Sequence, residues 1–414
     1  MTILLFVFYF IILLLIVNRI IKKTQLDIGF GTITAMFSFK VLLGCLYGYV
    51  FLHYYGGDDT WTFFNDSIFE YQKMIHHPAQ FFKDISPVDD FNQADSFFQF
   101  VKQYLYDLEY WLMRKLLAVF NIFSRGNYYI DTLFFDFVLL WGPLLLFKLL
   151  RSYFPSKKTI IISILFFIPS VGFWLSGIRA EGLIFLFMVI TIYYSAKCFN
   201  KPNLRYLILT VIGIAGMLIF RGVFLLVFIP AFLSFVLTSM LNRKAFFIFI
   251  IVYIISVIIF FGSSLVSENN NLPASVVSRQ QEFFQLHGKT VLQLDSLQPT
   301  FQSFLKISPQ AFSNVFFHPF IWEAKGILQI ISSLDVLMFW FLIIILLIFH
   351  EKNWRELLNK PVLILFLFYG FTLMLLIGFI VPFPGAIVRY KAIPELLLLS
   401  YIALGINYKK TIKL

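Results

Sequence analysis

Two adjacent carboxylates follow a pair of glycines in the segment His53-Tyr54-Tyr55-Gly56-Gly57-Asp58-Asp59-Thr60-Trp61. Glycine adopts backbone conformations that other residues avoid, so the two glycines permit a sharp turn just before Asp58 and Asp59. A carboxylate at such a turn can act as a general base and accept a proton from a reacting hydroxyl group. The alternative is an ordinary solvated turn, where glycine and aspartate are both common. Asp58 and Asp59, called the acidic pair below, are the candidate catalytic residues.

Basic residues stand at three places in otherwise apolar sequence. Arg179 comes two residues before Glu181 in the stretch 169–182, and Arg221 stands alone between apolar neighbours. The third place follows the turn Pro382-Phe383-Pro384-Gly385 and holds Arg389, Tyr390 and Lys391. Ionisable groups in or beside a membrane are costly to bury, so they are candidates for function.

The guanidinium groups suit a phosphate ligand. Arginine presents a planar fork of donors that binds phosphate oxygens in pairs, and it keeps its charge. We therefore expect Arg179, Arg221 and Arg389 to bind substrate. Glu181, Tyr390 and Lys391, which lie next to these arginines in the sequence, are expected to bind substrate with them. The alternative is that Arg179 pairs with Glu181 while the other two arginines extend toward lipid headgroups.

His318 and Trp61 are further candidates for substrate binding. His318 lies in Phe316-Phe317-His318-Pro319-Phe320-Ile321-Trp322-Glu323-Ala324-Lys325, where aromatic side chains, a histidine and an acid could line an entrance. Aromatic residues at a membrane interface are also ordinary anchors, which is the competing interpretation. No metal site is predicted, because His76-His77 has no evident partner ligands and Cys45 and Cys198 lie in separate apolar runs.

The amino-acid composition of the chain is typical of a protein embedded in lipid. Of the 414 residues, 60% are hydrophobic and 13% are charged, about half the charged fraction of a soluble domain. The net charge of +11 does not indicate a nucleic-acid partner, since the basic residues lie at the ends of apolar runs and not on one face. The chain also lacks the glycine-rich phosphate loop of nucleotide-binding proteins.

The sequence predicts an all-α, polytopic membrane protein with a single transmembrane domain over 1–414. Each expected span approaches the length of about twenty residues that crosses a bilayer. The expected spans, about eleven in number, are 2–21, 33–54, 130–152, 157–175, 180–198, 204–220, 222–240, 245–264, 327–349, 361–381 and 387–406. The first is kept as a helix because its charges follow the apolar run, unlike those of a secretory signal.

Two long segments, 55–129 and 265–326, connect these spans on one side. In the first, aromatic residues and leucine recur at helical spacing over 61–82 and 96–123, which predicts amphipathic helices at the membrane surface. The second contains Asn269-Asn270-Asn271 and a polar stretch over 278–308, and is expected to be partly irregular.

The distribution of basic residues predicts the orientation. With the N-terminus outside and the C-terminus in the cytoplasm, the cytoplasmic connections collect most of the bases, among them Arg19, Lys40, Lys148 and Lys409. This agrees with the positive-inside bias of membrane proteins. The segments 55–129 and 265–326 then face outward, and so do the acidic pair and the candidate arginines.

This arrangement resembles the GT-C fold superfamily of polytopic membrane glycosyltransferases, which use polyprenyl-phosphate-linked sugars. The likeness rests on the acidic pair at the start of a large outer loop with surface helices, and on the stretches Trp174–Glu181 and Arg389-Tyr390-Lys391. One departure is that the acidic pair follows the second span here, whereas the superfamily usually carries it after the first.

The resemblance implies direct displacement at an anomeric carbon on the outer face. Asp58 or Asp59 would accept the proton of the acceptor hydroxyl, and the arginines would stabilise the departing lipid phosphate. The implied partners are a polyprenyl-phosphate-linked donor, a glycan, lipid or protein acceptor, and membrane lipid. No cofactor is expected, although some relatives use a divalent cation. We expect a bacterial inner membrane, because the chain is compact and shows no organelle-targeting signal.

Two other classes of protein fit part of the pattern. A flippase or transporter of a lipid-linked glycan would also need cations for phosphate, but with charges near the bilayer midplane and two related halves. A non-catalytic scaffold would use the outer loops to bind a partner and would not need Arg221 or Arg389. The sugar, the acceptor and the number of phosphates in the carrier are left open by the residues.

Overall fold

A computed structural model describes residues 2–83, 97–241, 243–265, 271–286, 290–324, 326–351 and 354–408. Residues 84–96 and 266–270 of the predicted outer loops, together with Lys325 and Lys409, lie outside these ranges. Within them every named element is a helix, and the isolated bridge between His350 and Ile406 is not part of a strand. The all-α prediction is confirmed for this part of the chain.

Eight helical runs in the described residues are long and apolar enough to cross a membrane, which supports the prediction of a membrane protein. They are Thr2–Lys23, Phe30–His53, Tyr128–Tyr153, Ala180–Asn200, Leu204–Leu241, Ala245–Leu265, Gln329–Ile348 and Pro361–Ile380. Two expected spans, 157–175 and 387–406, each consist of shorter helices. Two others, 204–220 and 222–240, are joined into the single run Leu204–Leu241. The arrangement with about eleven spans stays a prediction.

The chain divides into two compact units, one of Met1–Lys158 with Leu165–Leu225 and one of Thr159–Ile164 with Leu226–Leu414. The first unit contains α1 (Thr2–Lys23), α2 (Phe30–His53), α3 (Asp59–His76), α4 (Pro78–Lys83), α5 (Phe97–Ser124), α6 (Tyr128–Leu139), α7 (Trp141–Tyr153), η2 (Pro155–Lys157), α9 (Pro169–Trp174) and α10 (Ala180–Asn200). Two helices, α8 (Lys158–Phe166) and α11 (Leu204–Leu241), contribute residues to both units.

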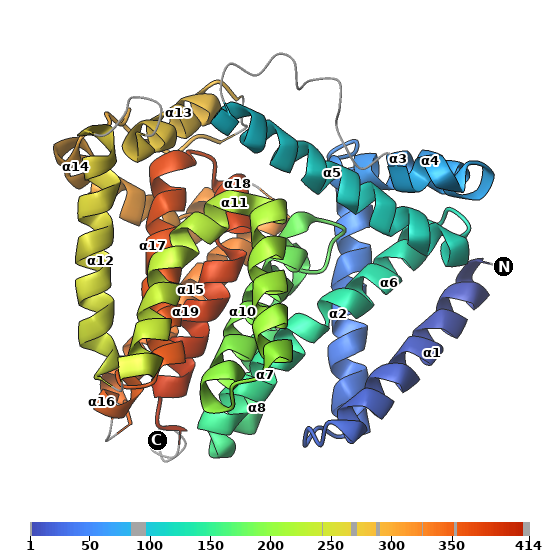
Figure 1. The fold of residues 1–414 in the computed structure, drawn as a ribbon, viewed down its shortest axis with the longest axis horizontal. Helices are drawn as coiled ribbons and strands as arrows, with labels where there is room; N and C mark the ends of the chain where they lie inside the picture. Colours follow the sequence, from blue (N-terminus) through green and yellow to red (C-terminus); the bar gives the residue numbers. More distant parts are fainter. Residues whose placement is uncertain are drawn as a thin grey trace. The chain divides into compact units, whose positions relative to one another are not determined.

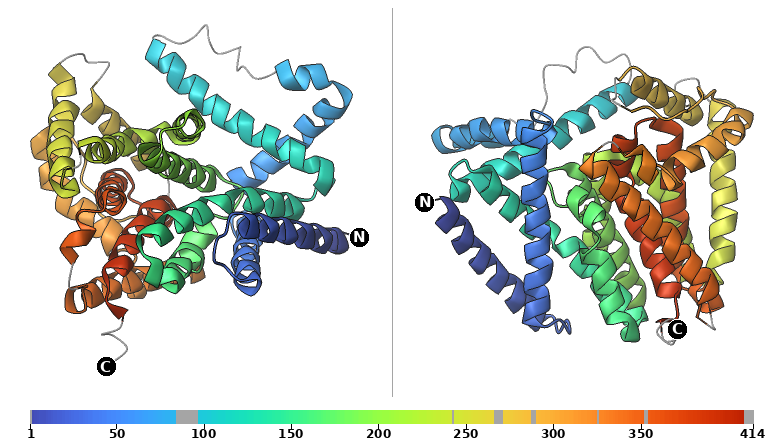
Figure 2. Two further views of the ribbon diagram at one scale, coloured as in Figure 1. Left: turned by 60° about the horizontal axis from the view of Figure 1, so that its bottom comes forward. Right: turned by 180° about the vertical axis from the view of Figure 1, so that it is seen from behind.

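In the first unit, α3, α4 and α5 cross the end of α2 and do not continue along it (Figure 1; Figure 2). Their bounds confirm the helices predicted over 61–82 and 96–123, whereas their location at a membrane surface stays a prediction. Helices α3 and α5 pack along each other through Phe63 and Tyr110. A buried hydrogen bond from Asn121 to Ser67 adds a polar link of 2.8 Å between the two helices.

The apolar run 130–152 forms two helices that meet at Leu140. Pro143 has no backbone N–H, so it cannot donate to the carbonyl group four residues earlier, and the helical hydrogen bonds are interrupted there. Helix α6 packs on α2, and α7 packs on α10. These contacts bring together parts of the sequence that carry the acidic pair and Arg179.

Helix α11 contains a break at Arg221, whose φ of −165° and ψ of 86° are not helical. The break falls at the predicted junction between the spans 204–220 and 222–240. A straight helix of 38 residues would be about 57 Å long, nearly twice the thickness of the hydrocarbon core. Each side of the break has about the length needed for one crossing.

The second unit contains α12 (Ala245–Gly262), η3 (Ser263–Leu265), α13 (Leu272–Phe284), α14 (Phe301–Phe316), η5 (Ile321–Glu323), α15 (Ile327–Ile348), α16 (Trp354–Leu357), α17 (Pro361–Ile380), α18 (Pro384–Tyr390) and α19 (Ala392–Gly405). Helix α17 packs on both α14 and α19. The side chain of Gln280 donates to the carbonyl oxygen of Phe379 and accepts from the amide of Leu297, which ties α13 to α17. The expected irregular stretch is confirmed at the described residues 290–300.

Candidate functional site

The turn before the acidic pair has the conformation that its glycines permit. Gly56 and Gly57 have φ angles of 70° and 108°, in the left-handed region that favours glycine. The amide of Gly57 donates to the carbonyl oxygen of Phe51 at 2.9 Å, which closes the end of α2. Helix α3 then begins at Asp59. The predicted sharp turn is therefore confirmed.

The first turn of α3 is fixed by contacts to α2 and α6. The indole N–H of Trp61 donates to the carbonyl oxygen of Gly48 at 2.9 Å, and its ring stacks on Tyr128 with centroids 4.0 Å apart. The buried hydroxyl of Thr60 lies 2.7 Å from the hydroxyl of Tyr128. Trp61, expected to bind substrate, is thus engaged in holding the turn in place.

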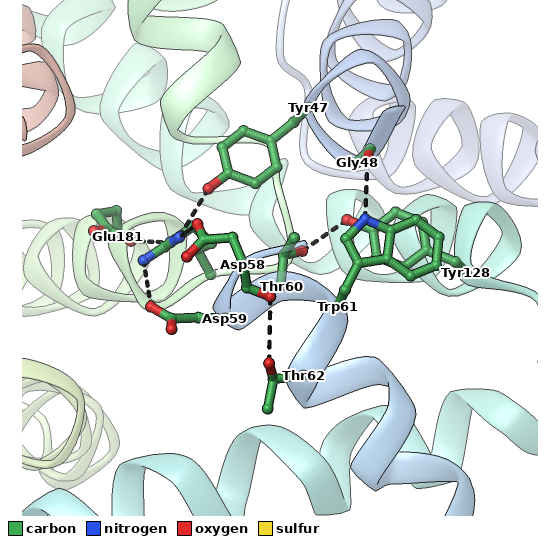
Figure 3. A network of polar contacts seen from close by, with 10 residues as sticks. Tyr47, Gly48, Asp58, Asp59, Thr60, Trp61, Thr62, Tyr128 and Glu181 are labelled. Carbon is green, nitrogen blue, oxygen red and sulfur yellow. Dashed lines mark hydrogen bonds and ion pairs between the residues drawn. The ribbon is translucent and has the colours of Figure 1, made fainter. Parts of the chain in front are cut away.

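Arg179 binds both members of the acidic pair. Its Nη1 donates to Asp58 Oδ2, and its Nη2 donates to Asp59 Oδ2 at 2.8 Å. Nη1 also donates to the hydroxyl of Tyr47 at 3.0 Å, and Nε lies 3.5 Å from Glu181 Oε2. Figure 3 shows Tyr47, Asp58, Asp59 and Glu181 converging around this guanidinium group. These five residues are called the Arg179 cluster below.

Exposure to solvent rises across the Arg179 cluster. The side chains of Arg179 and Glu181 are 2% and 3% exposed, whereas those of Asp58 and Asp59 are 25% and 61% exposed. A buried cation thus holds two carboxylates that a ligand can approach from solvent. Asp59 is the more accessible of the two.

The charge of Arg179 is secured by its neighbours. Burial alone would lower the pKa of Arg179, but Glu181, Tyr47 and the acidic pair together raise the pKa above its ordinary value. The guanidinium therefore stays charged while it is buried. With its donors directed at carboxylates and at Tyr47, Arg179 orients the acidic pair in this structure and does not present its fork to a phosphate.

Gly44 allows the connection before Arg179 to approach α2 and α6. A Cβ atom at Gly44 would overlap the Asp136 carboxylate and would lie 2.8 Å from the carbonyl oxygen of Ser176. On the same side of α2, Lys40 Nζ donates to the carbonyl oxygen of Leu175 at 2.9 Å. The elements that carry the Arg179 cluster are thereby packed closely together.

Arg221 lies at the junction between the expected spans 204–220 and 222–240 and contacts α5. Its Nε lies 3.8 Å from Glu109 Oε1, and its side chain is 28% exposed. Next to Glu109 on α5, the hydroxyl of Tyr110 donates to Asp66 Oδ2 at 2.6 Å. Burial and this hydrogen bond raise the pKa of Tyr110 to about 12. Arg221 thus belongs to the same unit as the Arg179 cluster but contacts a different carboxylate.

The remaining predicted site residues belong to the second unit. Lys391 and Glu395 are both buried, with 3.9 Å between Nζ and Oε2. Arg389 lies over the ring of Tyr390, and His318 Nδ1 lies 2.8 Å from Glu323 Oε2. The structure therefore brings together four of the ten predicted residues, namely Asp58, Asp59, Arg179 and Glu181, and engages the others in separate contacts.

Sequence reasoning missed Tyr47 and the partner of Lys40. Lys40 was counted only as a cytoplasmic base, yet its Nζ lies 3.5 Å from Asp136 Oδ1 between α2 and α6. Lys40 lies inside α2 and not at its end, while the side of the membrane that it faces stays a prediction. The signal for this pair in the sequence was that each is a single ionisable residue inside an apolar run.

A divalent cation at the acidic pair would share the two carboxylates with Arg179. Both aspartates direct an oxygen at the Arg179 guanidinium, which competes with a cation for the same lone pairs. In the described ranges no three His, Cys, Asp or Glu side chains gather to form a metal site. A divalent cation at the acidic pair stays an expectation from the resemblance.

No protein-family model, no curated protein and no solved structure matches this chain.

Proposed function

We propose that this protein is a membrane glycosyltransferase that moves a sugar from a polyprenyl-phosphate-linked donor to an acceptor on the outer face. The observation that carries the proposal is the solvent-facing acidic pair held by a buried guanidinium group. Preorganised carboxylates next to a membrane suit proton transfer from a hydroxyl that approaches from solvent. The resemblance to the GT-C fold superfamily supplies the class of donor.

Asp59 is proposed as the general base, because its side chain is the more exposed of the pair. The acceptor hydroxyl gives its proton to the Asp59 carboxylate while its oxygen forms a bond to the anomeric carbon of the donor. The bond between that carbon and the phosphate oxygen breaks, and the phosphate leaves with the electron pair. Asp58 and Arg179 hold Asp59 in the orientation that this proton transfer needs.

Arg221 is proposed to stabilise the leaving phosphate. Its guanidinium is partly exposed and belongs to the same unit as the acidic pair, and its contact to Glu109 is long for an ion pair. Arg389, in the second unit, remains a second candidate for this role. Both assignments predict a weaker interaction with the donor when the charge is removed.

The test is transfer of a radiolabelled sugar by the purified protein in lipid nanodiscs, with polyprenyl-phosphate and polyprenyl-diphosphate donors and a panel of acceptors. We expect Asp59→Asn to lower the rate by about 10²- to 10⁴-fold, the range typical of a lost general base. Arg221→Gln and Arg389→Ala should raise the donor KM if these cations hold the phosphate. Asp27→Asn is the matched control, because Asp27 is exposed and pairs with Lys158 outside the cluster.

Retained transfer by Asp59→Asn together with loss in Asp58→Asn would exchange the roles of the two aspartates. Retained transfer by both single variants would remove the acidic pair from the mechanism.

A flippase or transporter of a lipid-linked glycan is the second candidate, and one observation favours it. Lys40 and Asp136 form an ion pair inside helices that are candidate spans, where such a transporter would carry charges. Proteoliposomes with a fluorescent lipid-linked glycan distinguish the two functions. Movement of the glycan between leaflets without sugar transfer would favour the flippase, and neither activity would favour a scaffold.

A further inference from the structure

Lys40 is an isolated cation in the middle of α2, inside an apolar candidate span. Its Nζ donates to the carbonyl oxygen of Leu175 at 2.9 Å and to Ser176 Oγ at 3.2 Å, and it lies 3.5 Å from Asp136 Oδ1. The side chains of Lys40 and Asp136 are 10% and 0% exposed. Helices α2 and α6 and the connection that holds Leu175 and Ser176 all belong to the first unit.

An ammonium group in such a place is costly and therefore needs an explanation. Burying an ion pair is weak support for stability, because the lost hydration often outweighs the attraction between the charges. A methionine and leucine pair of similar volume would fill the same space without that cost. The hydrogen bonds of Lys40 to the connection after α9 are what an apolar pair could not supply.

The connection that Lys40 holds leads directly to Arg179. Helix α9 ends at Trp174 and α10 begins at Ala180, so Leu175 and Ser176 lie outside regular helix. Both are buried, and a carbonyl oxygen buried there without a donor would be unfavourable. Three residues after Ser176, Arg179 has an extended backbone and directs its guanidinium at the acidic pair.

We infer that Lys40 is a positioning residue for the Arg179 cluster. It fixes the Leu175–Ser176 connection against α2, and through that connection it sets the place of Arg179 and of the acidic pair. The inference deepens the proposed function, because it assigns a role in orienting the general base, but the contacts that carry it are independent of the reaction.

Hydrogen–deuterium exchange in nanodiscs tests the inference without donor or acceptor. In the double variant Lys40→Met with Asp136→Leu, no charge is left unpaired, so the fold is expected to persist. We expect peptides covering 175–182 and 56–62 to exchange about two- to tenfold faster, as the loss of one or two hydrogen bonds predicts. Unchanged exchange in these peptides would overturn the inference and leave Lys40 as a charge partner of Asp136 alone.

A second double variant, Lys40→Gln with Asp136→Asn, also removes both charges but keeps a donor on the side chain of residue 40. It should exchange more slowly over 175–182 than the Met–Leu variant, which a simple charge-pair role would not produce. If the Met–Leu variant does not fold, the double variant Lys40→Met with Asp136→Asn replaces it, and unchanged exchange over 175–182 in that variant would overturn the inference.

Lys115 provides the matched control. It is another buried lysine, 2.5 Å from Glu70 Oε2 and donating to the carbonyl oxygen of Phe81 at 2.7 Å, but it joins α5 to α3 and α4. The variant Lys115→Met with Glu70→Leu should speed exchange in 78–83 and leave 175–182 unchanged. Faster exchange over 175–182 in this control as well would mean that the effect is general loosening, and would overturn the inference.

Sugar transfer is a separate measurement that distinguishes the two claims. If wild type transfers sugar, kcat should fall by a larger factor than the donor KM rises in the double variant Lys40→Met with Asp136→Leu. The base is displaced in this variant, while the phosphate contacts persist. If wild type transfers no sugar but exchange over 56–62 rises as expected, the proposed function fails and the positioning role of Lys40 stands.

Discussion

The Arg179 cluster and the Lys391–Glu395 pair are both buried cation sites, but they differ in where their carboxylates point. In the first, a guanidinium that is 2% exposed holds Asp58 and Asp59, whose side chains are 25% and 61% exposed. In the second, the amine and the carboxylate are exposed by only 2% and 3% and lie 3.9 Å apart on neighbouring turns. The first arrangement presents charge to a ligand, whereas the second satisfies charge within the fold.

This difference teaches that burial of a cation does not identify a functional site in a membrane protein. Removing one partner of a buried pair is costly in either arrangement, because the other charge is left without compensation. Only the arrangement with accessible carboxylates should affect chemistry when it is altered. Measurements that separate stability from activity can therefore break or sharpen the comparison.

Arg179→Met should have the largest effect on stability. Removing the guanidinium leaves Glu181 buried next to the acidic pair with no cation among them, and a broken buried pair costs about 3–5 kcal/mol. We expect a lower thermal unfolding midpoint in nanodiscs and loss of any sugar transfer. An unfolding midpoint within one degree of wild type would show that the cluster is solvated, and the contrast with the second site would disappear.

Lys391→Met should destabilise the protein by about 3 kcal/mol, the lower end of the range for a broken buried pair, since it strands a single buried carboxylate at a long contact of 3.9 Å. The double variant Lys391→Met with Glu395→Leu should recover most of that loss, because no charge then remains unpaired. Thermal unfolding of the single and double variants measures this recovery. A double variant that unfolds like wild type but has lost donor binding would assign Lys391 to the substrate, as the sequence predicted, and would break the comparison.

Gly44→Ala should cost about 1–3 kcal/mol, because the added methyl group overlaps Asp136 and the connection before Arg179. Gly31→Ala on the same helix is the control, since a Cβ atom there meets nothing within 4 Å. Alanine favours helix over glycine by about 1 kcal/mol, so the control should be neutral or stabilising. Equal unfolding midpoints for the two variants would mean that α2 is not closely packed at the cluster.

Tyr110→Phe should have the smallest effect, and that effect should disappear at alkaline pH. The pKa of Tyr110 is raised to about 12 by burial and by its hydrogen bond to Asp66, so folded protein holds this proton more tightly than unfolded protein. The stability that Tyr110 contributes is therefore complete below about pH 10 and is lost as the pH rises toward 12. The difference in unfolding midpoint between wild type and Tyr110→Phe should shrink from pH 9 to pH 11. A constant difference would place the Tyr110 hydroxyl in water.

Local features of the fold were predictable from the sequence because they depend on neighbouring residues. Apolar runs of about twenty residues identify helices that can cross a membrane, and aromatic residues at helical spacing predicted α3 and α5 to within a few residues. The glycine turn at Gly56-Gly57 was predictable for the same reason, since only its own backbone requires positive φ angles. The break at Arg221 coincides with the junction between two expected spans.

The sequence by itself therefore determined most of the long apolar helices, the turn and the identity of the charged residues available for a site. The tertiary structure alone decided which charges meet. Arg179 binds carboxylates about 120 positions earlier in the chain, and Lys40, which charge counting treated only as a cytoplasmic base, pairs with Asp136. Hydropathy records that a charge is costly in lipid, but the partner that compensates it is set by helix packing. For that reason Arg179 was predicted as a phosphate ligand, whereas its packing directs it to the acidic pair.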